Sequence, residues 1–137
     1  MGDSTFIIDG VNVEAIEWKE EYEIEVLERF DIGLYPLPDE PWVYGKSGSK
    51  AIVYMALGIP TVATAIGANF RIIENESNGF LVKVDNEQEW YDRIEQLILS
   101  QQLRESLGKE GRKTIVEKYS IEANKENYLN VFQSVLE

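Results

Sequence analysis

The sequence predicts an α/β fold in which a parallel sheet is covered by helices and followed by a helical C-terminal extension. Three observations predict it. Short apolar segments alternate with segments of helical periodicity as far as residue 82. One of these apolar segments, residues 61–64, has the apolar character of a strand that is buried on both faces of a parallel sheet. After residue 86 the apolar spacing is helical throughout.

The first 35 residues are expected to hold three strands and one helix. Strands are predicted at residues 5–8 and at residues 11–18, where apolar and polar side chains alternate. Residues 20–30 carry apolar side chains at helical spacing between glutamates, which predicts an amphipathic helix. A third strand over residues 31–35 ends at Pro36, where a long loop rich in proline and glycine begins.

The middle of the chain is expected to alternate between buried helix and buried strand. Residues 49–57 are apolar almost all round, which indicates a buried helix, and Gly58 with Pro60 should end it. The strand at 61–64 follows, then a turn into a short helix within residues 66–75. Asn78-Gly79 opens a last strand at residues 80–82.

The C-terminal part is expected to be helical. Asn86 and Glu89 fit a capping box at the start of a helix whose apolar stripe includes Trp90 and Leu97. A second helix begins near Leu103, with Gly108 and Gly111 as its expected weak points. Ser120 can cap a third helix, whose apolar stripe is formed by Tyr128, Val131, Phe132 and Val135.

The composition excludes several classes of function. The 137 residues are enough for one domain. The chain has neither cysteine nor histidine, which excludes disulfides, thiolate metal sites and a Ser-His-Asp triad. Its 13 basic and 25 acidic residues give a net charge of −12, which argues against binding to nucleic acid. Without an apolar run of membrane-spanning length or a signal peptide, a cytoplasmic location is expected.

Two loops follow predicted strands at the sheet edge where ligands of open α/β sheets bind. The first contains Gly45, Lys46, Ser47, Gly48, Ser49 and Lys50. Its glycines, lysines and position at a helix N-terminus have the properties of an anion site, although the spacing does not fit a P-loop. A glycine-rich turn with solvated lysines explains the same residues equally well. The second loop, with Gly67, Ala68 and Asn69, is a weaker candidate, because Gly67 is also explained by a tight turn.

Other polar clusters are better explained as surface. The glutamates at residues 20–28 form the wet face of the predicted helix, and the acidic residues at 74–89 lack the ligand spacing of a calcium site. No metal site is therefore predicted. Trp42 is kept as a candidate because it lies in the first loop.

The order and spacing of several motifs resemble glycosyltransferase family 4, specifically the C-terminal, donor-binding half of the GT-B fold. They are DIGLYPLP at residues 31–38, GKSGSK at 45–50, YMALGIPTVA at 54–63 and NGFLV at 78–82. The resemblance covers roughly residues 26–137. It implies a Rossmann-like sheet and retaining transfer of a sugar from a nucleotide-sugar donor to an acceptor. It also implies that the loops at 45–50 and 67–69 bind the donor phosphates without a metal or another cofactor.

Three residues depart from the family pattern. Gly45 and Val53 stand where the family has two glutamates eight positions apart, so no catalytic residue can be assigned. Arg71 replaces a common acidic residue. Lys50, in contrast, matches a lysine found in a subgroup of the family.

We therefore expect residues 1–137 to form one donor-binding domain, with residues 1–18 either a hairpin or a remnant segment. On this interpretation the chain is an enzyme fragment, inactive alone, and a missing N-terminal domain binds the acceptor glycan, lipid or small molecule. The alternative is a non-catalytic Rossmann-like domain that has lost the donor site. A receiver-type signalling domain is disfavoured because Asp9 and Asp31 are not placed where its chemistry needs them. The sugar, nucleotide base and acceptor leave no readable motif.

Overall fold

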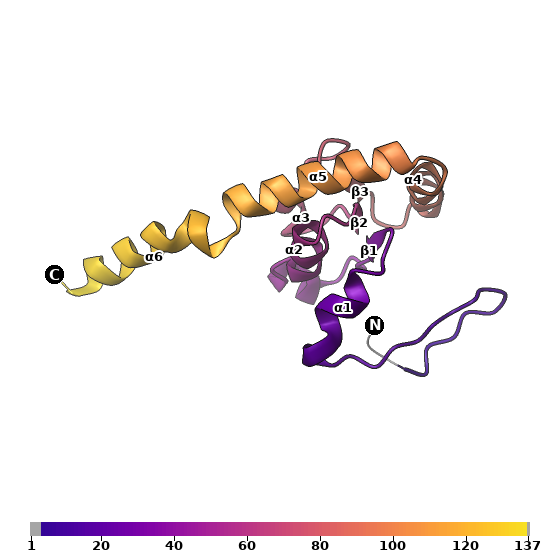
Figure 1. Cartoon of the computed structure of the whole chain (residues 1–137), viewed down its shortest axis with the longest axis horizontal. Helices are drawn as coiled ribbons and strands as arrows, with labels where there is room; N and C mark the ends of the chain where they lie inside the picture. Colours follow the sequence, from indigo (N-terminus) through magenta and orange to yellow (C-terminus); the bar gives the residue numbers. More distant parts are fainter. Residues whose placement is uncertain (1–3, 137) are drawn as a thin grey trace. The chain divides into compact units, whose positions relative to one another are not determined.

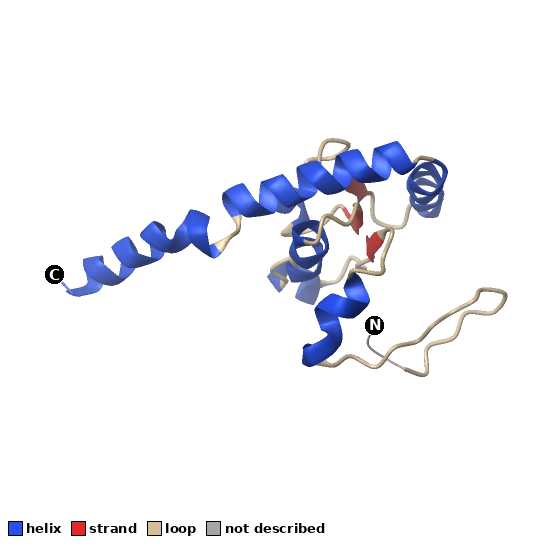
Figure 2. Cartoon of the chain, in the orientation of Figure 1, coloured by secondary structure: helices blue, strands red, loops and turns tan. Residues whose placement is uncertain are grey.

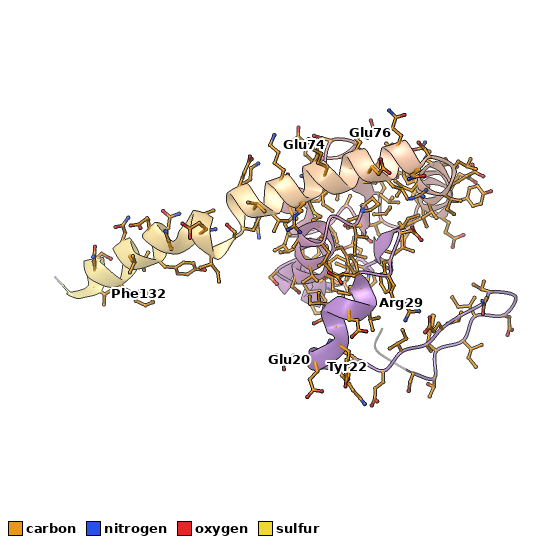
Figure 3. The ribbon with its side chains drawn as sticks, in the orientation of Figure 1. Glu20, Tyr22, Arg29, Glu74, Glu76 and Phe132 are labelled. Carbon is orange, nitrogen blue, oxygen red and sulfur yellow. The ribbon has the colours of Figure 1, made fainter. Side chains whose placement is uncertain are left out.

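The computed structural model describes residues 4–136 and divides the chain into two compact units, one ending at Phe30 and one beginning at Asp31 (Figure 1). The first unit contains a 3₁₀ turn, η1 (Glu20–Tyr22), and one short helix, α1 (Glu23–Leu27). The helix expected over residues 20–30 is thus confirmed over a shorter span. Its neighbour Arg29 forms an exposed ion pair with Glu14 at 2.6 Å, also within this unit (Figure 3).

The prediction of two strands before this helix, at residues 5–8 and 11–18, is wrong. Residues 5–8 and 11–16 form loops and turns, drawn in tan in Figure 2. Phe6, Ile7 and Val11 are exposed, with 80% of the Ile7 surface accessible. Apolar alternation stabilises a strand only where neighbouring strands satisfy its backbone and bury one face, and an isolated pair of strands is marginal in water.

The second unit is built on a three-stranded parallel sheet in the order β1 (Gly33–Tyr35), β2 (Thr61–Thr64) and β3 (Phe80–Val82). Gly33 pairs with Thr61, and Val62 pairs with Phe80. All four residues of β2 are buried, as the apolar run predicts for a central parallel strand. The three predicted strands at 31–35, 61–64 and 80–82 are confirmed.

Helices cover both faces of the sheet. Alternate residues of β2 point to opposite faces, so Ala63 packs with α2 (Ser49–Ala56) and α3 (Asn69–Ile72). Val62 packs with Leu97 of α4 (Glu87–Leu99) on the other face. The expected α/β architecture, a Rossmann-like parallel sheet flanked by helices with a C-terminal helical extension, is confirmed.

Gly108 and Gly111 lie at close contacts of α5 (Gln101–Lys118), which corrects their interpretation as weak points. A Cβ on Gly108 would lie 2.1 Å from the carbonyl oxygen of Gly58. A Cβ on Gly111 would lie 3.1 Å from the carbonyl oxygen of Asn78 and 3.4 Å from Met55 Cγ. The missing side chains let α5 approach the C-terminal end of α2 and the turn before β3.

The predicted helix caps are confirmed. Asn86 Oδ1 accepts from Glu89 N–H at 3.2 Å, and Ser120 Oγ accepts from Ala123 N–H at 3.1 Å. The carboxylate of Glu89 accepts from the Asn86 side-chain amide and from Lys83 N–H.

The third C-terminal helix, α6 (Ile121–Leu136), continues the chain beyond α5, and its predicted stripe, including Phe132, is exposed (Figure 3). Among the helices of residues 4–136, none combines the length and apolar character needed to cross a membrane.

Candidate functional site

The two candidate loops lie against each other at the carboxyl ends of β1 and β2. A Cβ on Gly48 would lie 3.5 Å from Ala68 Cβ and 2.3 Å from the end of the Ile72 side chain. A Cβ on Gly67 would lie 3.6 Å from the carbonyl oxygen of Val43. The structure therefore brings segments 43–50 and 67–72 into one site, which sequence order alone does not require.

The N-terminus of α2 has the properties of an anion site. Gly48 is the N-cap, with φ +77°, and it offers no side chain to the helix. The first helical hydrogen bond runs from Ile52 N–H to Gly48 O at 3.1 Å. Among the described residues, no acceptor pairs with the N–H groups of Ser49 and Lys50, which are exposed, or of Ala51, which is fully buried. Free N–H groups and the positive end of the helix dipole attract a negatively charged ligand.

Two exposed lysines flank this helix end. No carboxylate in residues 4–136 forms an ion pair with Lys46 or Lys50. The ammonium of Lys46 lies over the Trp42 ring, 4.8 Å from its centroid, where the ring face attracts a cation. Both ammonium groups are therefore available to an anion.

Sequence reasoning kept Trp42 as a candidate but did not single out two other exposed aromatic residues on the same two segments, Tyr44 and Phe70. Trp42, Tyr44 and Phe70 are 54%, 60% and 62% exposed. Tyr44 Oη donates to the Asp39 carboxylate at 2.8 Å, and that hydrogen bond with the carboxylate charge raises the pKa of Tyr44. The one feature of the sequence that could have identified these aromatic residues is that they stand close to the loop glycines. No periodicity distinguishes them from ordinary loop residues.

Three of the predicted site residues are buried, namely Gly48, Ala68 and Asn69, and Asn69 is only 1% exposed. Its amide nitrogen donates to Thr64 O at 2.9 Å, and its Oδ1 has no partner among the described residues. A phosphate oxygen needs a hydrogen-bond donor, whereas the free atom of Asn69 is an acceptor. Asn69 therefore fixes the second loop against the end of β2, and Ala68, also buried, packs in the core beside it.

The positions that depart from the family pattern also lie around this site. Gly45 ends the 3₁₀ turn η2 (Pro41–Gly45), and a Cβ added to it would meet nothing within 4 Å. Val53 is half-buried on α2. The guanidinium-bearing Arg71 is exposed, and its carbonyl oxygen accepts from Tyr119 Oη at 2.8 Å. Neither Gly45 nor Val53 can supply a carboxylate to a sugar.

The described residues contain no group of three or more acidic side chains arranged to hold a metal ion. What the geometry offers is an arrangement suited to an anion such as phosphate: unpaired N–H groups at a helix N-terminus and two ammonium groups that form no ion pair among the described residues. Neither loop contains a carboxylate, a histidine or a cysteine.

Comparison with known proteins bears on the family of this chain. The family model described as Glycosyl transferases group 1 matches residues 11–114. The chain is 39% identical over 62 residues to a poly(ribitol-phosphate) alpha-N-acetylglucosaminyltransferase of Staphylococcus aureus, with 45% of this chain and 13% of that protein covered. It is 31% identical over 80 residues to spore coat protein SA of Bacillus subtilis, with 58% and 21% covered. The chain thus spans about a fifth or less of these relatives.

Solved structures share the fold. The C-terminal domain of a glycosyl transferase group 1 family protein from Francisella tularensis superimposes with a TM-score of 0.63 at 27% identity, over 77% of this chain and 53% of that one. A glycosyltransferase from Rickettsia africae gives a TM-score of 0.72 at 20% identity, over 89% of this chain and 31% of that one. At that lower identity the likeness concerns the fold alone.

Proposed function

Because the chain belongs to the glycosyl transferases group 1 family, we propose that it serves in the transfer of a sugar from a nucleotide-sugar donor to an acceptor and supplies the donor-binding site. The observation that carries the proposal is the N-terminus of α2, which presents free N–H groups between Lys46 and Lys50. Retention of configuration, a transfer without a metal and a cytoplasmic location belong to the same proposal.

The proposed role of the site is to stabilise the leaving group. When the bond between the sugar and the diphosphate breaks, negative charge develops on the phosphate oxygen that leaves. Fixed N–H groups and ammonium groups at that point lower the energy of the transition state, because they need no reorganisation as the charge appears. A nucleoside diphosphate carries the same charges, so it is the simplest ligand for a test.

The test is a titration of the 137-residue chain with UDP, GDP and ADP, followed by amide NMR. We expect selective shifts at residues 45–50 and 67–71, and the tightest ligand identifies the base. Lys50→Ala should weaken binding by about tenfold, since a charge-assisted hydrogen bond contributes about 1.5 kcal/mol or more. Lys109→Ala is the matched control, because Lys109 is an exposed lysine on α5. Equal affinity of both variants would contradict the proposed role of Lys50.

One observation favours a second candidate function, a non-catalytic domain that has lost the donor site. Gly45 and Val53 occupy the positions where the resembling family has glutamates. If the chain is such a non-catalytic domain, none of the three nucleotides at millimolar concentration should shift the amide NMR signals of residues 45–50, while the chain stays folded. The same titration therefore separates the two functions.

A further inference from the structure

A depression separate from the lysines lies at the carboxyl ends of the strands on the α4 side of the sheet. Its volume is about 340 Å³. Pro36, Leu37 and Pro38 follow β1, Thr64 ends β2, and Asp85, Asn86 and Glu87 follow β3, while Trp90 reaches it from the first turn of α4. All three strands thus direct residues into it, at the edge where open α/β sheets bind ligands.

The lining has an apolar wall and a polar wall. Trp90 is half-buried and packs on the cluster that contains Val62 and Leu97, so its ring is held in place. With the two prolines and Leu37 it forms an apolar surface of low conformational freedom. Asp85 and Glu87 form the polar wall, and neither has an ion pair or a side-chain hydrogen bond within residues 4–136. A ligand that fits must therefore combine an apolar face with hydrogen-bond donors.

The charges decide which ligands are compatible. No lysine or arginine lines the depression, and two carboxylates do, so an anion such as phosphate is repelled. The Thr64 hydroxyl accepts from Leu37 N–H at 2.8 Å, which leaves its own proton to donate. The lining therefore offers both acceptors and a donor. Hydroxyl groups match both, whereas an ammonium group can only donate.

We propose that this depression binds a neutral sugar ring, with a face of the ring packed on Trp90 and its hydroxyls donating to Asp85 and Glu87. The choice of a sugar among hydroxyl-rich ligands rests on the proposed function, which requires a sugar near this edge of the sheet. The ring can belong to the acceptor or to the nucleotide sugar. The chemistry is the same in both cases, and separate ligands distinguish them.

The experiment is amide and indole NMR of the 137-residue chain with methyl α-glycosides of glucose, mannose, galactose and N-acetylglucosamine. We expect at least one to shift the Trp90 indole N–H and the amides of residues 85–87, with a dissociation constant on the order of 1–10 mM for so small a ligand. UDP-glucose that shifts residues 45–50 and the depression together, where UDP shifts only the former, assigns the ring to the nucleotide sugar. Shifts from a methyl glycoside without that pattern assign it to the acceptor.

Variants test the carboxylates. In the Asp85→Asn/Glu87→Gln double variant, the glycoside should bind about tenfold more weakly. Asp85 has φ +55°, a conformation that asparagine also adopts, so this variant keeps the backbone. Glu117→Gln, an exposed glutamate on α5, should leave the affinity unchanged.

Three results would overturn the proposal: no shift from any of the four glycosides, unchanged affinity in the double variant, or shifts of the same signals by choline chloride alone. The nucleotide titration of residues 45–50 reads out a different set of amides, so its failure is distinguishable from failure of the sugar site.

Discussion

Replacing Gly108 with alanine tests how closely α5 approaches the end of α2. The added Cβ would lie 2.1 Å from the carbonyl oxygen of Gly58 and 3.7 Å from Pro60 Cδ. The nearer atom belongs to the backbone, so no rotation of a side chain can relieve the contact. The helix and the turn must therefore separate by about 1 Å or more to restore van der Waals distances.

The magnitude follows from two opposing effects. Overpacking in a tight interior costs about 1–3 kcal/mol, and a backbone neighbour puts Gly108 at the upper end of that range. Alanine favours the helix over glycine by up to about 1 kcal/mol. The free energy of unfolding should therefore fall by about 2 kcal/mol, which lowers Tm by roughly 8–12 °C in a unit of this size.

The assay is urea and thermal unfolding followed by far-UV circular dichroism, with Lys109→Ala as the control. Lys109 is the next residue of α5 and is exposed, so its replacement should change the stability by less than about 0.5 kcal/mol. If Gly108→Ala were as stable as the unchanged chain, or more stable, α5 would not contact Gly58 as described. The helix would then be free to accept a methyl group at that position.

Three further predictions concern a turn, a cap and a titration. Gly58 has φ +74°, so Gly58→Val should lower the free energy of unfolding by about 2 kcal/mol or more, and Gly58→Asn by clearly less; equal losses in urea unfolding would show that φ is not the cause. Asn86→Ala removes the cap of α4 and should cost about 1 kcal/mol in the same assay, whereas an unchanged midpoint would mean that the cap contributes nothing. Burial raises the pKa of Tyr35 above 10.0, so the folded state keeps its proton when the unfolded chain loses it. The contribution of Tyr35 to the free energy of unfolding is therefore fully present below about pH 10 and is lost as the pH rises above that value. Tyr35→Phe should reduce this fall, and an equal fall in both proteins would assign it to other groups.

Gly45 and Val53 stand where the family pattern has glutamates, so the site lacks a carboxylate at both positions. A site with free N–H groups and ammonium groups but no carboxylate at these positions can bind a diphosphate without contributing an acid or base to the transfer. The two proposals on this sheet edge are therefore complementary in charge, with cations on the α2 side and carboxylates on the α4 side. A ligand that carries both a diphosphate and a neutral ring matches that separation.

The sequence by itself determined the features that depend on neighbours within a few residues. The apolar run of β2, the cap from Asn86 to Glu89 and the glycine that ends α2 are all legible in short windows. Each results from backbone hydrogen bonds or conformational preferences between residues a few positions apart. The family resemblance extended this to the Rossmann-like arrangement of the sheet.

Only the tertiary structure decided the features that depend on distant partners. Residues 5–8 and 11–16 have the alternation of strands, yet they have no sheet to join and stay in loops. Gly108 looks like a helix breaker until Gly58 is found against it. From the sequence, Asp85 is predicted to lie on the surface and Trp90 on the apolar face of a helix. Only the structure shows that the ends of three strands bring both residues to one depression. Local preferences act over a few residues, whereas burial and clefts arise from contacts between segments dozens of residues apart, which no short window contains.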